Sequence, residues 1–252
     1  LNRIIRRWRQ ADSNCPTTQL TTVGISIPSE YSYLDNDETF LQYDSGTDDS
    51  KRILTFASDE ALQQLKQHKN WVADGAFKCC SSISFPLYIL HIQIDNFNAS
   101  RLFALLPDKS QDTYSKLFAK INELLQNEGL DNIIMDFEKA ALNRSLELFP
   151  RSNLACCLFH FGQNVYKHAV QEGLKLRYHK DYSFSLKMRY FVALAFLPVD
   201  DVVDGYEQLV YDDDIPQSIV SYFENNHIGL PRGRGQRRRR LEPLFPLPIW
   251  NV

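Results

Sequence analysis

Two short apolar runs that each contain an aspartate constrain the fold of this chain more than any other feature. The first is WVADGAFK (71–78), with Asp74 in its middle, and the second is IIMDFEKAA (133–141), with Asp136. Apolar runs of this length are typical of buried strands. Each strand would therefore deliver one carboxylate to its end.

If these two strands are neighbours, their carboxylates repel one another unless a cation lies between them. Mg²⁺ and Mn²⁺ take carboxylate oxygens as ligands and support phosphoryl-transfer chemistry. A single aspartate in such a place is better explained as the cap of a strand or turn, whereas the pair favours a metal site. The sequence thus predicts that Asp74 and Asp136 hold a divalent cation.

The composition is that of a globular protein with one large domain or two modest ones. The chain has 252 residues, of which 44% are hydrophobic and 12% aromatic. No segment approaches the roughly 18 continuous apolar residues of a membrane helix, and the N-terminus lacks the apolar core of a secretory leader. Five cysteines form no disulfide rhythm, and two pairs, Cys79–Cys80 and Cys156–Cys157, lie in apolar runs. We therefore expect reduced thiols in a cytosolic or nuclear protein without membrane contact.

Although the net charge is only −3, the arginines are unevenly distributed along the chain. Four lie near the N-terminus, and six lie in a second run: Arg232, Arg234, Arg237, Arg238, Arg239 and Arg240. Without these ten arginines, the chain has 18 basic residues against 31 acidic ones, a net charge of −13. Such a body does not attract DNA through its average field, so the arginines and a bound cation would have to do so. The second run predicts contact with the phosphate backbone or a nuclear import signal; an inert loop is less favoured.

The order of elements from residue 71 onward resembles a ribonuclease-H-like α/β fold, a mixed sheet flanked by helices. Expected strands and helices alternate as strands 72–78, 87–95 and 101–106, helix 112–128, strand 133–136, helix 138–149, strand 154–158 and a helix near 163–172. In that fold the first and fourth strands are adjacent. Asp74 and Asp136 would then lie side by side.

We divide the chain into four parts. They are an Arg-rich helix and β/loop segment (1–50), a ribonuclease-H-like core (51–179), an all-helical insertion after the fifth strand (180–228) and an irregular Pro-, Gly- and Arg-rich tail (229–252). The first part should contain a helix at 1–10 and strands at 23–27 and 39–43. The core should open with a strand at 52–57 and a helix capped by Ser58.

With these residues in hand, the chain resembles the Mutator-like element (MULE) transposase domain from about residue 50 onward. The matching motifs are WVADGAFK (71–78), LLPDK (105–109) with Tyr114 and Phe118, DFEKAA (136–141), CLFHF (157–161), ALAFLP (193–198), YFEN (222–225) and PIWN (248–251). The resemblance implies cut-and-paste DNA transposition by a DDE triad on a ribonuclease-H-like fold. It also implies two Mg²⁺ or Mn²⁺ ions, with transposon ends and target DNA as partners in the nucleus.

In this resemblance Asp74 matches the first catalytic acid and Asp136 the second. The third acid of the family is a glutamate in a stretch like N-N-x-x-E-x-x-H after the Trp-Asn segment, and this sequence ends at Val252 before it. We therefore expect the isolated chain to be inactive. Glu138 is better explained as the start of the next helix, where an acidic side chain is favourable. The run 212–214 is better explained as a solvated turn.

Cys157 and His160 form a C-x-x-H motif at the expected end of the fifth strand, and related transposases share this signature. We expect the pair to order the site or to contact DNA. A structural zinc ion needs about four ligands, and only Cys156, His168 and His179 are within easy reach in the sequence, so zinc is the less favoured alternative.

The leading hypothesis is a MULE transposase catalytic core that cuts and transfers DNA strands. The alternative is a domesticated or decayed remnant that binds DNA or protein without catalysis. A ribonuclease-H-like nuclease unrelated to transposition is a poorer third reading. A homo-oligomer is compatible with the resemblance, although nothing in the sequence points to an interface.

Overall fold

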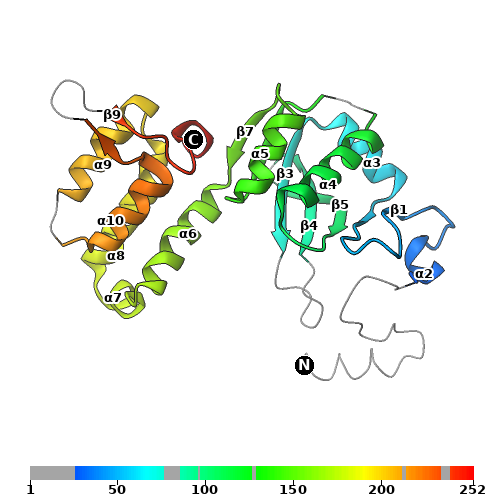
Figure 1. Ribbon diagram of the computed structural model, residues 1–252, viewed down its shortest axis with the longest axis horizontal. Coiled ribbons are helices and arrows are strands. Elements are labelled where there is room, and N and C mark those ends of the chain that lie inside the picture. The colour runs from blue at the N-terminus through cyan, green and yellow to red at the C-terminus, as the bar shows by residue number, and fades with distance from the viewer. Residues whose placement is uncertain (1–25, 77–85, 96, 127–128, 212–213, 234–238) are drawn as a thin grey trace.

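A computed structural model describes residues 26–76, 86–95, 97–126, 129–211, 214–233 and 239–252. The described chain forms an α/β part, built on one mixed sheet, and a helical part beside it along the long axis (Figure 1). Helix α6 (Leu158–Gln171) leads from the sheet into the helical part. None of the helices in the described ranges combines the length and apolar character that a membrane crossing requires.

The sheet has seven strands in the order β1-β2-β5-β4-β3-β6-β7. They are β1 (Leu41–Asp44), β2 (Leu54–Phe56), β3 (Asn70–Ala76), β4 (Leu87–Ile94), β5 (Phe97–Leu105), β6 (Asn132–Met135) and β7 (Asn153–Cys156). The pairs from β1 to β3 are antiparallel, whereas β3, β6 and β7 run parallel. The carboxyl ends of these three parallel strands therefore meet at one edge of the sheet.

Helices α4 (Gln111–Leu124) and α5 (Lys139–Leu148) lie against one face of the sheet (Figure 1). Residues of β4 alternate between buried and half-buried, as a strand with one covered face requires. Tyr88 points to the covered side, where its ring packs edge-on against Tyr114 and Phe118 of α4. This apolar layer is the core of the α/β part.

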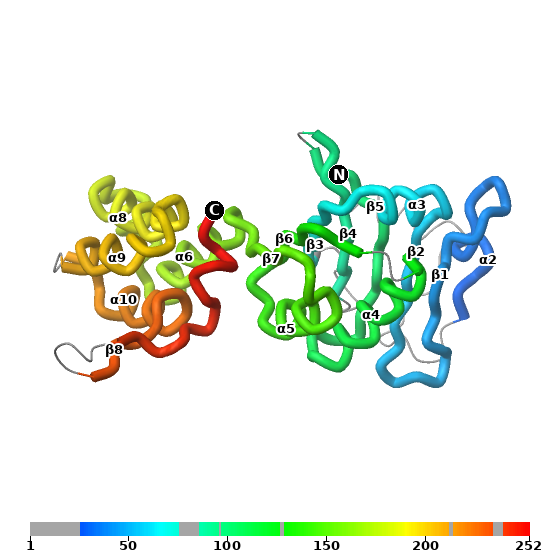
Figure 2. Tube along the Cα trace, turned by 90° about the horizontal axis from the view of Figure 1, so that it is seen from above, coloured from blue at the N-terminus to red at the C-terminus, as the bar shows by residue number. Residues whose placement is uncertain are grey.

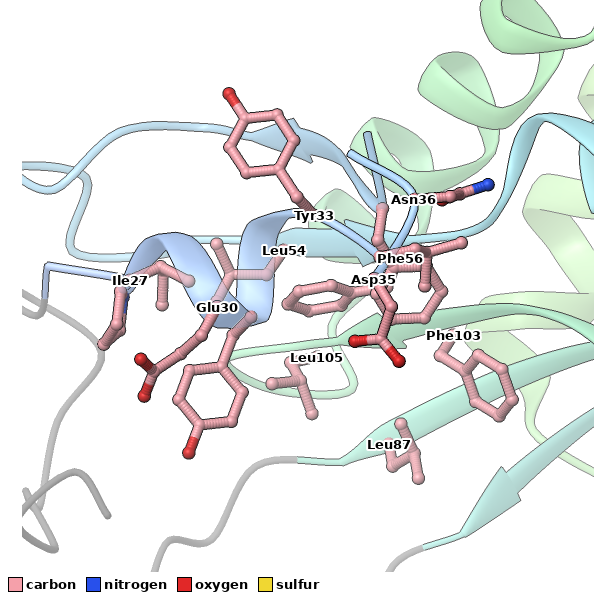
Figure 3. Close-up of a pocket in the computed structure, with 14 residues that line it drawn as sticks. Ile27, Glu30, Tyr33, Asp35, Asn36, Leu54, Phe56, Leu87, Phe103 and Leu105 are labelled. Atoms are coloured by element: carbon pink, nitrogen blue, oxygen red, sulfur yellow. The ribbon is translucent and has the colours of Figure 1, made fainter. Parts of the chain in front are cut away.

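Helix α3 (Asp59–Gln67) begins where the sequence predicted, because the Ser58 side chain accepts a hydrogen bond from the Ala61 amide at 3.1 Å. The short helix α2 (Ser29–Ser32) and the residues after it lie over the opposite face at β2 and β5. A cavity of about 920 Å³ remains between them, lined largely by apolar side chains such as Leu54, Phe56 and Phe103 (Figure 3).

The helical part comprises α6, α7 (Lys175–Lys180), α8 (Tyr182–Ala193), α9 (Val202–Val210), α10 (Gln217–Phe223), the 3₁₀ turns η1 (Leu194–Phe196) and η2 (Val199–Asp201), and the π-helical turn η3 (Glu224–Ile228). A short hairpin follows, β8 (Pro231–Arg232) with β9 (Arg239–Arg240), and then the 3₁₀ turn η5 (Leu247–Ile249). The last residues run back toward the sheet and lie beside β7 (Figure 2). Trp250 is 1% exposed and stacks on Phe161 of α6.

The predicted mixed sheet flanked by helices is confirmed, and the order of strands and helices from residue 71 onward is as expected. Strands predicted at 39–43 and 52–57 are β1 and β2, and they extend the same sheet. The helix predicted at 1–10 and most of the strand predicted at 23–27 lie outside the described residues; Ser26 and Ile27 are not in a strand. The division into four parts stays a prediction.

Two predictions about local structure were wrong. The helix expected near 163–172 begins at Leu158, directly after the N-cap Cys157, with Phe161 and Val165 buried. His160 therefore lies in the first turn of a helix and not at the end of a strand. The tail is not irregular throughout, since it contains the β8–β9 hairpin and the 3₁₀ turn η5.

Candidate metal centre

The pairing of β3 with β6 brings Asp74 beside Asp136. Their parallel register joins Asn70 to Asn132 and Val72 to Ile134. Continuing this register by two residues places Asp74 opposite Asp136, which directly follows β6. The two aspartates thus meet at the edge where the parallel strands end, as the sequence predicted.

The next strand and helix bring His160 to the same edge. The β6–β7 register ends with Met135 opposite Cys156, and the Cys157 amide then donates to the Met135 carbonyl at 2.8 Å. Cys157 is the N-cap of α6, so His160 is the third residue of that helix. A strand that turns directly into a helix therefore aims this imidazole back at the ends of β3 and β6.

Asp74, Asp136 and His160 form one cluster. His160 Nε2 lies 3.9 Å from Asp74 Oδ1, and His160 Nδ1 is in contact with Asp136 Oδ1. One ligand atom from each residue lies within 4.8 Å of those of the other two. The Asp136 side chain is 16% exposed, His160 24% and Asp74 43%. The cluster is open to solvent on the Asp74 side.

The pKa shifts of the clustered residues indicate that a positive charge would be favourable at this site. Burial, followed by the charges of Asp74 and Glu138, raises the pKa of Asp136 to about 7, although the Gly75 amide and Lys109 act in the opposite direction. Burial lowers the pKa of His160, and the charge of Asp74 opposes this shift. Bringing a divalent cation to these groups would remove the repulsion between the carboxylates.

The residues present fit such a cation. Within the described part of the chain, Asp136 Oδ1 and His160 Nδ1 are buried and neither makes a hydrogen bond of acceptable geometry, although they touch each other. Buried polar atoms without partners are rare in proteins and require an explanation. Two carboxylates and an imidazole are ligands that divalent first-row metals accept.

Glu138 anchors the turn that carries Asp136. Its backbone amide donates to the Asp136 carbonyl at 2.8 Å, and it forms the N-cap of α5, in agreement with the prediction that it opens that helix. Lys109 Nζ lies 2.6 Å from Glu138 Oε1, and the Tyr114 hydroxyl donates to Glu138 Oε2. The carboxylate of Glu138 is thus held by the α4 side of the fold and is not one of the clustered ligands.

Phe137, between the two acids, connects this edge to the helical part. Its ring centre lies 5.6 Å from that of Phe161, 5.0 Å from that of Phe245 and 5.7 Å from that of His227. The position of Asp136 therefore depends on packing in both parts of the molecule.

The joint role of Cys157 and His160 in ordering the site stays a prediction. His160 joins the aspartates, whereas no cluster of three or more metal-ligating residues in the described ranges includes Cys157. Cys156 is a buried free thiol, and His168 stacks on the Tyr222 ring at 4.0 Å between centres. The zinc alternative therefore receives no support from the described residues.

Of the six arginines in the second run, three are described. Arg232 and Arg239 are exposed at the hairpin. Arg240 is engaged within the protein: its guanidinium lies 2.7 Å from Glu207 and 3.2 Å from Glu224, and over the Tyr206 ring. The prediction that Arg240 contacts the DNA backbone stays a prediction, although these two acids pair its charge within the protein. Arg234, Arg237 and Arg238 lie outside the described residues.

Sequence reasoning missed three contributors to the site. It did not place His160 against the two aspartates, and it gave Lys109 and Tyr114 no role beyond that of motif residues. All three lie in motifs that had been recognised, LLPDK with Tyr114 and CLFHF. The motifs did not show which side chains these three residues contact.

The comparisons with known proteins point to one family. Residues 70–164 match the model of the MULE transposase domain, a range that contains Asp74, Asp136 and His160 together with Lys109 and Glu138. A search of curated proteins found no similar sequence. The match supports a relationship to the MULE family and a transposase-related function, which implies interaction with DNA and suggests the use of divalent metal ions.

Proposed function

We propose that this chain carries the catalytic centre of a MULE-type DDE transposase, which cuts and transfers DNA strands with divalent cations held by Asp74 and Asp136. The observation that carries the proposal is the convergence of both carboxylates at the ends of adjacent parallel strands, inside the range that matches the transposase domain.

The topology supports a ribonuclease-H-like core. In the order β5-β4-β3-β6-β7, the neighbours β5, β4 and β3 pair antiparallel, and β6 and β7 run parallel to β3. The central strand, β3, is the first of these five strands along the chain. The sequence predicted that the first and fourth strands of that fold are adjacent, and β3 and β6 are adjacent. The helices after β7 would then be the helical insertion of the transposase domain.

The chemistry would take place at the exposed side of the cluster. When bound, Mg²⁺ or Mn²⁺ activates a water or a DNA 3′-hydroxyl and stabilises the leaving oxygen of the scissile phosphate. Asp136, the more buried acid, would hold the cation from within. Asp74, with a side chain that is 43% exposed, would hold it where a phosphate can approach.

The acidic body of the chain gives the cations a second role, because they would offset the repulsion between the carboxylates and the DNA backbone. Among the described arginines of the second run, Arg232 and Arg239 are exposed for backbone contacts. A nuclear location and a homo-oligomer are part of the same proposal.

The proposal is tested by Mn²⁺ binding and Mn²⁺-dependent DNA cleavage. We expect Asp74→Asn and Asp136→Asn each to weaken Mn²⁺ binding at least about tenfold, because each removes a charged ligand. Asp131→Asn is the matched control, since this exposed aspartate lies just before the other end of β6. Cleavage should be assayed in a protein that also includes the family's third acid.

Loss of both binding and cleavage in the two variants, but not in the control, would support the enzyme. Equal cleavage by wild type and both variants would exclude these residues as the centre. DNA binding without metal-dependent cleavage would favour the alternative of a non-catalytic remnant.

A further inference from the structure

We infer that His160 is a nitrogen ligand of the cation held by Asp74 and Asp136, and that it makes the centre prefer Mn²⁺ over Mg²⁺. The inference rests on the proposed function, since it concerns the same cation. It adds a third ligand from residues within the matched domain and commits to a choice between the two metals.

The distances allow one ion to reach all three residues. Ligand atoms bound to one octahedral ion at about 2.1 Å lie about 3 Å apart when adjacent and about 4.2 Å apart when opposite. His160 Nε2 is 3.9 Å from Asp74 Oδ1, and the ligand atoms of the whole cluster lie within 4.8 Å of one another. The His160 ring would have to turn away from Asp136 Oδ1, which its Nδ1 contacts, for one ion to enter between the three groups.

The imidazole is built into this position. The chain passes from β7 into α6 at Cys157, whose amide is bound to the Met135 carbonyl at the end of β6. The residue after His160, Phe161, is fully buried and stacks on Trp250 at 4.9 Å between ring centres. Cys157 and Phe161 are thus held in place within the first turn of α6, and the His160 side chain between them faces the two aspartates.

Two buried atoms of the cluster, one on Asp136 and one on His160, lie where a cation could be their partner. Among the described residues, Asp136 Oδ1 and His160 Nδ1 are in contact and buried, yet they lack hydrogen-bond geometry.

A His160 that binds the metal and a His160 that only orders Asp136 predict different effects on the binding of Mn²⁺ and Mg²⁺. Mg²⁺ demands oxygen ligands and strict octahedral geometry, whereas Mn²⁺ binds imidazole more readily. A ligating His160 therefore affects Mn²⁺ binding more than Mg²⁺ binding. A His160 that only orders Asp136 would affect both equally.

The experiment is pulsed electron paramagnetic resonance on the chain loaded with Mn²⁺, with Mn²⁺ and Mg²⁺ affinities measured in parallel. We expect a nitrogen hyperfine coupling to Mn²⁺ in the wild type and its loss in His160→Gln. In that variant Mn²⁺ affinity should fall about tenfold or more, while Mg²⁺ affinity changes much less. His179→Gln is the matched control, because His179 is exposed on α7 beyond the far end of α6.

Mn²⁺ binding without nitrogen coupling in the wild type would overturn the inference and leave the proposed function intact. Coupling that persists in His160→Gln, or an equal loss of Mn²⁺ and Mg²⁺ affinity, would also overturn it. Absence of any Mn²⁺ binding by the folded wild type would overturn both proposals. If His160→Gln does not fold, wild-type protein with isotopically labelled histidine decides the question, because the coupling must change with the nitrogen isotope.

Discussion

Lys109 donates to Glu138 across 2.6 Å and so ties the loop after β5 to the turn that carries Asp136. Both residues lie close enough to Asp136 to shift its pKa, in opposite directions: Glu138 raises it and Lys109 lowers it. A pair that looks like an ordinary surface ion pair thus sets both the position and the charge of a candidate metal ligand.

Replacing the two members of this pair should have opposite effects on metal binding. Lys109→Met removes a positive charge, so we expect the pKa of Asp136 to rise and Mn²⁺ affinity at neutral pH to fall by roughly threefold, the scale of a partly exposed ion pair. Glu138→Gln removes a negative charge and should lower that pKa, with no loss of affinity. Calorimetric titration with Mn²⁺ checks this. Weakening of equal size in both variants would show that position, and not charge, is the main contribution of the pair.

Binding of Mn²⁺ should depend steeply on pH around neutrality. The metal-free pKa of Asp136 is raised to about 7 by burial and by Asp74 and Glu138, so below that pH a proton must leave before the metal can bind. We expect the apparent affinity to fall by about tenfold per pH unit below pH 7 and to level off above it. Titrations at several pH values check this. An affinity constant from pH 5 to 8 would contradict it.

The same ionisation should lower the stability of the metal-free protein. Because the folded pKa of Asp136 is raised, the unfolded chain releases the proton first, and stability falls as pH rises from about 4 to 7. Asp136→Asn should therefore stabilise the metal-free protein at pH 8, by about 2 kcal/mol, while it removes metal binding. Thermal unfolding at pH 8, without metal and with it, measures both effects. A destabilised variant under metal-free conditions would count against the assignment.

His227 should make the helical part sensitive to acid. It is fully buried among aromatic rings, neither ring nitrogen has a partner among the described residues, and burial lowers its pKa to about 3. Because the folded pKa is depressed, the unfolded chain takes up the proton first, and stability is lost as pH falls below about 6.5. At pH 5 the loss from this residue should be about 2 kcal/mol.

Replacing His227 with Phe, which suits the aromatic surroundings, should remove this part of the pH dependence. Unfolding by urea at pH 7.5 and pH 5 in wild type and His227→Phe is the measurement. His179→Gln, at an exposed histidine, serves as the control. A wild type and a His227→Phe variant that lose equal stability between the two pH values would show that His227 is not the sensitive group.

Arg240 should contribute to stability rather than to DNA binding. It is largely buried, pairs with Glu207 and Glu224, and lies over the Tyr206 ring. Arg240→Gln should therefore destabilise the protein by about 1–3 kcal/mol, because it removes the guanidinium that pairs with both acids. The neighbouring Arg239→Gln should leave stability almost unchanged and, if the hairpin meets DNA, weaken DNA binding more at low salt than at high salt. Denaturant unfolding and DNA binding at two salt concentrations separate the two roles.

The sequence by itself determined the order of strands and helices and the presence of an aspartate near the end of each of two strands. These features are local, since an apolar run, a cap such as Ser58 and a helical period are all read from consecutive residues. The pairing of Asp74 with Asp136 also followed, because a fold with adjacent first and fourth strands places their ends together.

Only the tertiary structure decided which other side chains meet these aspartates. His160 joins them because α6 begins directly at the end of β7, five residues earlier than the sequence indicated, and this start depends on where Phe161 finds a buried place. Glu138 is fixed and Arg240 is paired because residues distant in the chain, Lys109 and Glu207 among them, come to lie beside them. Such contacts depend on packing between elements, and no pattern of neighbouring residues encodes them.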